Sequence, residues 1–188
     1  ERMRIDSSGN VGIGTSSPSA LLDVLSASNP SIKVRSNGGT LGNYAELTLQ
    51  SYNSFSGSGQ AFVRGLSSAS GNSNTDLVFG TNDSGFGAPV ERMRIDSSGN
   101  LLVGKTTTAF GTQGVRLSTV GSVLATSTNN APAELNRLSS DGDILGFYKD
   151  GAPVGSIGTD GASGDFYVQS QITNHAGLGF KVNEVLPR

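Results

Sequence analysis

The 188-residue chain contains no cysteine and no tryptophan, and it has only six prolines. Without cysteine it can form neither a disulfide framework nor a metal centre held by thiolates. Its 13 basic and 15 acidic residues nearly balance, giving a net charge of −2. This balance argues against nucleic acid as a partner, because nucleic-acid-binding domains carry a basic surface. No apolar run approaches the roughly 20 residues that a membrane-spanning helix needs, so we expect no membrane insertion.

Small polar and flexible residues dominate the composition. Glycine, serine, threonine and asparagine make up 83 of the 188 residues, whereas leucine, isoleucine, valine and phenylalanine make up 46. This apolar share lies just above the level typical of disordered chains, and the low net charge also argues against disorder. The composition therefore predicts a turn-rich β protein with a small core, which needs partners to be stable.

A ten-residue sequence occurs twice without a change, at Glu1–Asn10 and at Glu91–Asn100. A weaker third copy is Arg137–Leu145, which follows the pattern of Arg94–Leu102. Self-similarity of this kind is typical of modular arrays, in which each unit buries its apolar face against its neighbours. We therefore predict three modules. They are residues 1–90 with loops rich in serine, glycine and asparagine, residues 91–136, and residues 137–188 as a divergent β module.

The repeated sequence has the pattern of a β-hairpin. Met3 and Ile5 alternate with Arg2 and Arg4, as in a strand with one buried face. The Asp-Ser-Ser-Gly-Asn that follows is a turn signal, because aspartate can cap a turn and glycine accepts a positive φ. A return strand is predicted to begin at the next residue.

Outside the repeat, short alternating segments predict further strands, and helix is scarce. A hairpin is predicted over Phe147–Ile157, with Asp150-Gly151 as its turn. Ser17–Leu25 fits both a short helix, with proline at its first position, and an extended strand. Ala133–Leu138 could form one helical turn at most. The further predicted strands are Ser31–Arg35, Ala45–Gln50, Gln60–Arg64, Asp76–Phe79, Gly114–Ser118 and Asp165–Gln169.

So many short strands leave many unpaired edges, and the chain has little apolar mass with which to protect them. Three identical chains around one axis would pair these edges and bring the sparse apolar side chains into a shared core. We therefore predict an all-β fold that forms an elongated, intertwined homotrimeric fibre of repeated β-hairpin modules, like a β-prism or a triple β-helix, with little or no helix. The predicted trimer core includes Met3, Ile5, Met93 and Ile95. A single-chain β-sandwich is the alternative.

Two stretches of the sequence resemble phage proteins. Glu1–Pro18 resembles a motif that is abundant in tail fibres and tailspikes of tailed bacteriophages, especially marine and cyanobacterial phages. Leu138–Leu145, together with the residues up to Gly158, resembles the segment that often precedes an endosialidase-type intramolecular chaperone, which would lie beyond Arg188. The resemblance implies a trimeric, β-rich virion appendage on the extracellular face of the phage tail. Its implied partners are its own copies, other virion tail proteins and the host surface.

Two motifs suggest ligands but fit structural roles better. Gly99–Thr106 matches the phosphate-loop pattern G-x-x-x-x-G-K-[ST], yet its Asn-Leu-Leu-Val favours a strand and no helix start follows. In the first repeat the equivalent of the lysine is Thr15, so the repeat does not require it. Asp6–Asn10 is rich in oxygen ligands, but Ser17 stands where an EF-hand needs glutamate. We expect no cofactor and no metal.

Catalytic residues are equally scarce. His175 is the only histidine, and no G-x-S-x-G sequence occurs. Most acidic residues lie in turn contexts that already account for them, so we do not expect an enzyme. Sugar contacts are a more reasonable prediction, since aromatic rings stack on sugars and amides bind their hydroxyl groups. The candidates are Tyr44, Tyr52, Asn53 and Phe55, for which packing in a core or an interface is the alternative role.

These observations leave three classes of function open. The first is a structural and adhesive segment of a phage tail fibre, which attaches to a host-surface glycan or lipopolysaccharide through many weak contacts. The second is a bacterial surface adhesin or filament built from similar repeats. The third is a fragment of a tailspike that depolymerises glycans.

Overall fold

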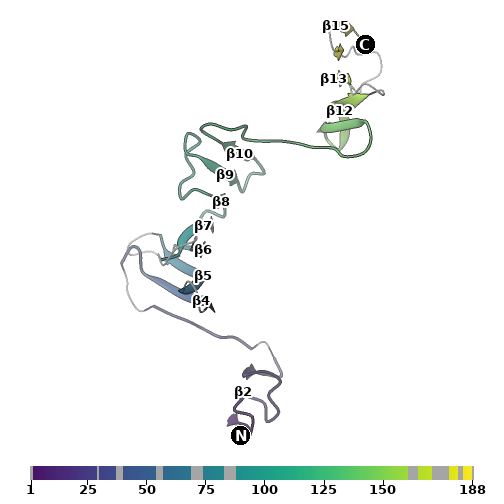
Figure 1. The fold of residues 1–188 in the computed structure, drawn as a ribbon. Coiled ribbons are helices and arrows are strands. Elements are labelled where there is room, and N and C mark those ends of the chain that lie inside the picture. Colours follow the sequence, from purple (N-terminus) through teal and green to yellow (C-terminus); the bar gives the residue numbers. More distant parts are fainter. Residues whose placement is uncertain are drawn as a thin grey trace. The chain divides into compact units, whose positions relative to one another are not determined.

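The computed structural model describes residues 2–28, 30–36, 40–53, 57–68, 74–82, 88–160, 165–170, 178–181 and 184–187. Within these residues the fold is all-β, with no helix and with three separate sheets, none of them closed (Figure 1). The all-β prediction is therefore confirmed. Contacts divide the chain into two compact units, Glu1–Thr126 and Ser127–Arg188, and each is described by itself.

The first sheet contains the first copy of the repeat. Its strands are β1 (Met3–Ile5), β2 (Val11–Ile13) and β3 (Leu22–Val24). β1 and β2 form the predicted antiparallel hairpin, and β3 adds to β2 in parallel. Of the two alternatives for residues 17–25, the extended strand is therefore correct. The Asp23 carboxylate accepts hydrogen bonds from the backbone N–H and the hydroxyl of Ser19. These bonds close the loop before β3.

The second sheet is a seven-stranded antiparallel meander in which each strand pairs with the next one along the chain. Its strands are β4 (Tyr44–Asn53), β5 (Gly57–Ser67), β6 (Thr75–Thr81), β7 (Val90–Ile95), β8 (Leu101–Val103), β9 (Gly114–Leu117) and β10 (Val123–Thr126). Four predicted strands fall within β4, β5, β6 and β9 and are confirmed. The sequence analysis missed β10. The sheet runs without interruption across residue 90, where a module boundary was predicted.

One predicted strand is wrong. Ser31–Arg35 has the alternation of a strand, but these residues pair with no strand in the described part of the chain. Ile32 and Val34 instead lie beside Ala45 and Leu47 of β4. Side-chain alternation alone does not form a strand, because a strand also needs a neighbouring edge at the right distance.

The third sheet lies in the second unit and contains β11 (Gly142–Lys149), β12 (Ala152–Asp160), β13 (Asp165–Ser170), β14 (Leu178–Lys181) and β15 (Glu184–Pro187). The predicted hairpin and the predicted strand at 165–169 are confirmed. Asp150 and Gly151 both have positive φ values, of 52° and 80°, as a type I′ turn requires. The weak third repeat does not form the same hairpin, because β11 begins only at Gly142 and no strand precedes it at Arg137.

The turn of the repeat is held by its aspartate. The Asp6 carboxylate accepts hydrogen bonds from the backbone N–H groups of Ser8 and Asn10 at 2.8 and 2.9 Å. In the second copy, Asp96 accepts the same two bonds at 3.0 and 2.8 Å. The glycine before each asparagine has a φ near 85°, a conformation that only glycine adopts without strain. Identical sequences thus form identical turns in two different sheets.

The turn between β9 and β10 has the same hydrogen bonds as the two aspartate turns, although its sequence does not match the repeat. The backbone N–H of Ser118 donates to the carbonyl of Ser122, and that of Gly121 to the carbonyl of Ser118. These are the same backbone bonds that the two aspartate turns make, with serine hydroxyls in place of the carboxylate and the amide. Gly121 has a φ of 83°. The hairpin unit therefore occurs three times in Glu1–Thr126, once with a diverged sequence.

Gly121→Ala is expected to lower the free energy of unfolding by about 1–2 kcal/mol, because alanine is strained at a positive φ. Gly111→Ala is the matched control, since an added Cβ meets nothing within 4 Å at either position and only Gly121 has a positive φ. The control should stay within about 0.5 kcal/mol of the original chain. Urea unfolding followed by circular dichroism measures both, and equal losses would contradict the turn geometry.

The first turn is also expected to open at low pH. The hydrogen bonds from Asn10 and Ser8 hold the pKa of Asp6 below its ordinary value of 3.8. Because the folded-state pKa is below the unfolded-state value, these bonds contribute stability above the unfolded-state value and lose it as the pH falls through the folded-state pKa. An NMR titration of the Asp6 carboxyl group should give a midpoint below that of the same group in the chain unfolded in urea. Equal midpoints in the folded and the unfolded chain would refute the capped turn.

Candidate assembly surface

One face of the seven-stranded sheet alternates arginine with aliphatic residues. We call it the arginine face. The strand register places one row of residues directly across all seven strands: Glu46, Arg64, Val78, Arg94, Leu102, Arg116 and Leu124. Val78 and Leu102 are each only 1% exposed, although no second sheet layer covers them among the described residues. In this row Val78 lies between Arg64 and Arg94, and Leu102 lies between Arg94 and Arg116. Arginine stems commonly lie along apolar surface while the charged group stays at the rim.

Carboxylates hold Arg94 in this row. Its guanidinium forms two 2.6 Å hydrogen bonds with Glu91 and a third of 2.6 Å with Asp76. Asp76 is buried and also accepts the backbone N–H of Ser97 at 2.9 Å. The hydrogen bonds that Arg94 donates to Glu91 are the largest cause of the raised pKa of Arg94. These bonds satisfy the charges of this part of the face within the chain.

Arg64 is held in a similar way near the edge of the sheet. Its Nε donates to Glu46 at 2.7 Å, and its guanidinium lies 3.8 Å from the ring centre of Tyr44 and 4.0 Å from that of Phe62. Such cation–π contacts stabilise a guanidinium group that lies against the face of an aromatic ring. Burial alone would raise the pKa of Glu46, but hydrogen bonds from Thr48 and Arg64 leave it below its ordinary value. On the arginine face, Arg64 and Arg94 therefore have carboxylate partners within the chain, and Val78 and Leu102 are buried.

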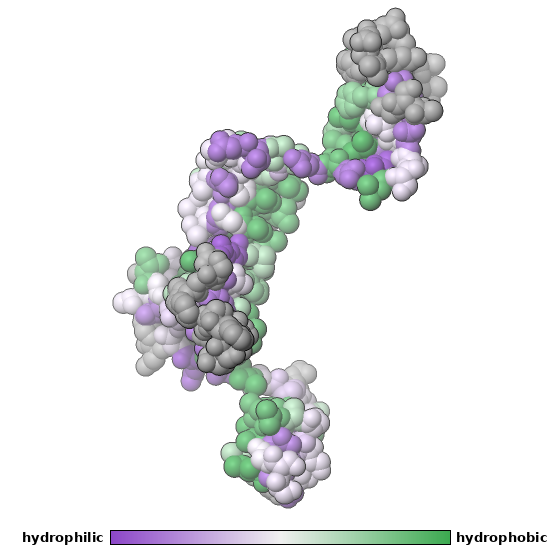
Figure 2. Space-filling view, in the orientation of Figure 1, coloured by the Kyte–Doolittle hydropathy of each residue, from purple (hydrophilic) through white to green (hydrophobic). Residues whose placement is uncertain are grey.

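The opposite face of the same sheet is apolar, and among the described residues only Ile32 and Val34 lie against it, at the β4–β5 end. We call it the apolar face. Its residues are paired across neighbouring strands by the register and are Leu47, Leu49, Ala61, Val63, Leu77, Phe79, Met93, Ile95, Leu101, Val103, Val115, Leu117, Val123 and Ala125. Leu47 is 59% exposed and Val123 72% exposed. Figure 2 shows apolar side chains gathered along one side of this sheet.

The two smaller sheets also have one apolar face each. In the first sheet, the register aligns Met3 with Ile13 and Ile5 with Val11, and all of these except Val11 are exposed. In the third sheet, the register aligns one aliphatic residue from each of four strands. They are Leu145, Ile157, Val168 and Leu178. Each sheet thus carries one apolar face that lacks a covering layer in the described residues.

The four residues predicted for the trimer core all lie in these apolar sets. Met93 and Ile95 lie on the apolar face of the seven-stranded sheet, Met93 half-buried and Ile95 exposed. Met3 and Ile5 are the equivalent exposed residues of the first sheet. By contrast, the buried apolar side chains of the described chain, Phe62, Val78, Leu102 and Tyr167, lie elsewhere. The role of the four in a trimer stays a prediction.

The predicted sugar contacts are not brought together by the described residues. Tyr44 is 48% exposed and lies on the arginine face, where Arg64 occupies one side of its ring. Tyr52 and Asn53 belong to β4, but their side chains lie outside the described residues, as does Phe55 entirely. Of the four, only Tyr44 can therefore be placed, and its ring already has a structural partner.

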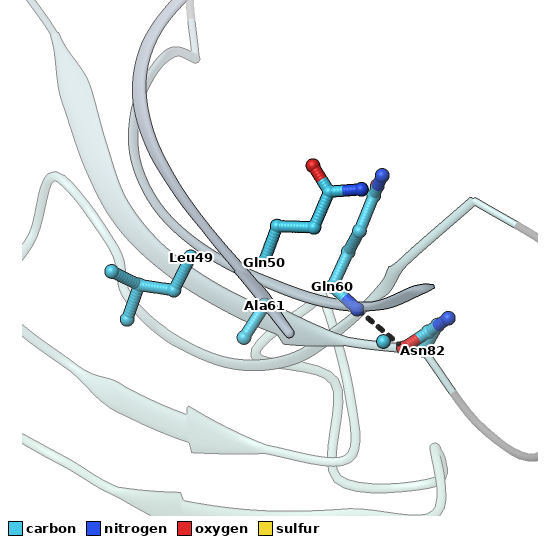
Figure 3. Close-up of a pocket in the computed structure, with 6 residues that line it drawn as sticks. Leu49, Gln50, Gln60, Ala61 and Asn82 are labelled. Carbon is cyan, nitrogen blue, oxygen red and sulfur yellow. Dashed lines mark hydrogen bonds between the residues drawn. The ribbon is translucent and has the colours of Figure 1, made fainter. Parts of the chain in front are cut away.

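A shallow depression at the end of the β4–β5 pair contains amides that the sequence analysis did not single out. It has a volume of about 360 Å³ and is lined by Leu49, Gln50, Gly59, Gln60, Ala61 and Asn82. Gln50 and Gln60 project together on one side of the strand pair, whereas Leu49 and Ala61 project on the other (Figure 3). The backbone N–H of Gln60 donates to the Asn82 side chain at 2.9 Å. Amides in this arrangement can bind hydroxyl groups, but the described residues contribute no aromatic ring to the depression.

The lysine of the phosphate-loop motif has a structural role. Lys105 is only 7% exposed, and its Nζ donates to the carbonyls of Ala109 and Thr112 at 2.7 and 2.9 Å. The residues before it form β8 and not a phosphate-binding loop. Lys105 therefore satisfies the carbonyls of the loop that leads to β9.

The residues that the structure describes contain no group of three side chains that could hold a metal ion. They also contain no helix long and apolar enough to cross a membrane. His175 lies outside them. The carboxylates of Asp6 and Asp96 are engaged by their own turns.

No family model, curated protein or solved structure matches this chain. Function must therefore be argued from the surfaces themselves and from the repeated sequence.

Lys105→Met is expected to destabilise the chain by about 1–3 kcal/mol, because it leaves two carbonyl groups without a donor. Lys149→Met is the control, since the Lys149 side chain is 80% exposed and makes only a 3.7 Å ion pair with its neighbour. Thermal or urea unfolding distinguishes the two. Equal stability of both variants would show that Lys105 does not support the loop.

Proposed function

We propose that this chain is a structural and adhesive segment of the tail fibre of a tailed bacteriophage, and that it assembles as a homotrimer through its apolar faces. The observation that carries the proposal is the uncovered apolar face, which continues over all seven strands of the largest sheet. The resemblance of Glu1–Pro18 to tail-fibre sequences supports the choice of protein class.

The size of the apolar face supports assembly, because soluble single chains seldom expose so large a continuous apolar surface. Soluble monomers rarely expose contiguous apolar patches larger than a few hundred Å², and larger ones mark interaction sites. Full burial of a leucine or valine is worth about 1.5–3 kcal/mol. Since many of these side chains retain roughly half of their exposure, each would contribute on the order of 1 kcal/mol per copy on assembly.

A closed ring of three copies would place these faces on a common axis and leave the arginine faces outside. Closed symmetry also limits growth, because each apolar face is then covered and offers no further site. Two copies packed face to face would cover the same residues, so the mass of the assembly in solution has to distinguish two copies from three. The resemblance to trimeric phage fibres favours three.

In this proposal the segment has a mechanical role and catalyses no reaction. Three copies per fibre and several fibres per virion would turn weak contacts with a host glycan or lipopolysaccharide into lasting attachment. Other virion tail proteins would join the segment to the particle. The outward loops and the amides of the β4–β5 depression would be the surfaces available to sugars.

Light scattering of the purified chain tests the assembly. The expected mass is three times that of one chain and does not depend on dilution in the micromolar range. A mass of one chain would overturn the proposal, and a mass of two would replace the trimer by a face-to-face dimer.

Leu49→Asp is expected to dissociate the trimer, because it places a charge on the apolar face. Gln50→Asp is the matched control, since it adds the same charge at the next residue of the same strand but on the opposite face. Both residues are exposed, so both variants should fold as single chains. A trimer that survives Leu49→Asp would show that another surface holds the copies together.

A further inference from the structure

The seven-stranded sheet has a long open edge at β4. β4 pairs with β5 over ten residues without a register shift, and no described residue pairs with its other side (Figure 1). Proteins usually shorten or bend such an edge, or place lysine or proline on it, because its backbone groups can pair with any other strand. β4 contains neither lysine nor proline, whereas β10, at the other edge, has only four residues. The β4 edge is therefore suited to pairing.

The backbone hydrogen bonds show which residues of β4 point to the open side. The N–H of Ser67 in β5 donates to the carbonyl of Asn43, directly before β4, so Asn43 points to β5. Successive residues of a strand direct their backbone groups to opposite sides, and Asn43 is odd-numbered. The N–H and C=O groups of Glu46 and Thr48 therefore point to the open side.

The chain also contains a segment with the sequence of a strand and no strand partner. In residues 31–35, which we call the strap, Ile32 and Val34 alternate with Lys33 and Arg35, and the strap pairs with no strand in the described part of the chain. Ile32 is 73% exposed and Val34 57% exposed, although both lie beside the apolar face. The strap therefore buries little of its apolar surface within its own chain.

We propose that the strap of one copy adds to the β4 edge of a second copy as an antiparallel strand. It lies opposite residues 46–50 of that copy. Its two aliphatic side chains then extend the apolar face, and its two cations extend the arginine face. The inference rests on the proposed function, because it needs a second copy of the chain.

Side-chain packing selects this register. Residues directly opposite each other share a face, so Ile32 lies opposite Leu49 and Val34 lies opposite Leu47. Leu49 and Leu47 are 57% and 59% exposed in the single chain. A shift by two residues toward the start of β4 would place Val34 opposite Ala45 and would bury less apolar surface.

Charge favours the β4 edge over the β10 edge. The strap carries two positive charges, Glu46 is the only charged residue of β4, and β10 has none. In the proposed register Arg35 lies opposite Glu46. Glu46 accepts hydrogen bonds from Arg64 and Thr48, and a carboxylate has about four acceptor positions, so Arg35 can add a charge-assisted bond.

Two other occupants of the edge fit less well. In its own chain the strap lies at the face of the sheet, where Ile32 and Val34 line a depression together with Leu47 and Val63. Two β4 edges could pair with each other, but such a two-fold contact does not build a ring of three copies, in which two different surfaces meet. The strap of a second copy fits both the edge and the ring.

Because the chain has no cysteine, an introduced pair of cysteines can test the contact. Lys33 lies opposite Thr48 in the proposed ladder, at a Cα distance of about 5.5 Å that a disulfide can span. Lys33→Cys and Thr48→Cys are placed in two chains with tags of different size, which are co-expressed and oxidised. We expect a covalent dimer that contains both tags. Lys33→Cys with Leu49→Cys is the matched control and should give no such dimer, because Leu49 lies on the other face.

Three results of this experiment would overturn the proposal. One is the absence of the mixed dimer while light scattering still gives the mass of three chains, a result that leaves the proposed function standing. Another is a disulfide that forms within one chain carrying both Lys33→Cys and Thr48→Cys, because the strap would then pair with its own β4. The third is a mass of one chain, which removes the proposed function together with the second copy.

Hydrogen exchange tests the backbone ladder. Lys33→Pro removes an N–H that would donate to β4, and it should speed exchange of the Glu46 and Thr48 amides roughly tenfold. Val34→Pro is the control, since the N–H of Val34 points away from β4 and these amides should stay protected. Neither proline interrupts a strand pair within the described chain, so both variants should fold. Equal exchange in the two variants would show that no ladder forms.

Discussion

Strand alternation is the constraint on which the rest of this structure depends. Successive side chains of a strand point to opposite faces, so a meander in register collects one set of residues on each side. In the seven-stranded sheet this collects leucine, valine, isoleucine and methionine on one side, and arginines with their carboxylates on the other. A sheet of one layer can cover only one of these sides with its own side chains.

The side that the chain covers by itself is the charged one. Val78 and Leu102 are buried between arginines of neighbouring strands, and Glu46, Asp76 and Glu91 accept hydrogen bonds from Arg64 and Arg94. This is the reverse of an ordinary single-layer sheet, in which the polar side faces water and the apolar side is buried. The reversal leaves the apolar face without a covering layer in the described residues, and the functional proposal rests on this feature.

The two copies of the repeat show that a local sequence determines the hairpin but not the residues around it. Both copies form the same hairpin because the aspartate cap and the glycine with positive φ act within a few residues. Their environments differ because the strand beside each hairpin comes from elsewhere in the chain. Arg94 thus binds Asp76 of the neighbouring strand β6, whereas Arg4, in the same sequence, is exposed and donates to the Ser16 carbonyl.

The sequence by itself determined the all-β class, the hairpins at the repeats and at Asp150-Gly151, and most strands of the large sheet. These features follow from alternation and turn chemistry, which are local. It also indicated which residues share a face with Met93 and Ile95, but not that the face is left uncovered. Only the tertiary structure decided that Ser31–Arg35 pairs with no described strand, that the β9–β10 turn repeats the aspartate turn with serines, and that Lys105 caps a loop. These outcomes depend on which distant segment supplies a neighbouring edge, a carbonyl or a carboxylate, and pairing of that kind is not encoded within any short window of residues.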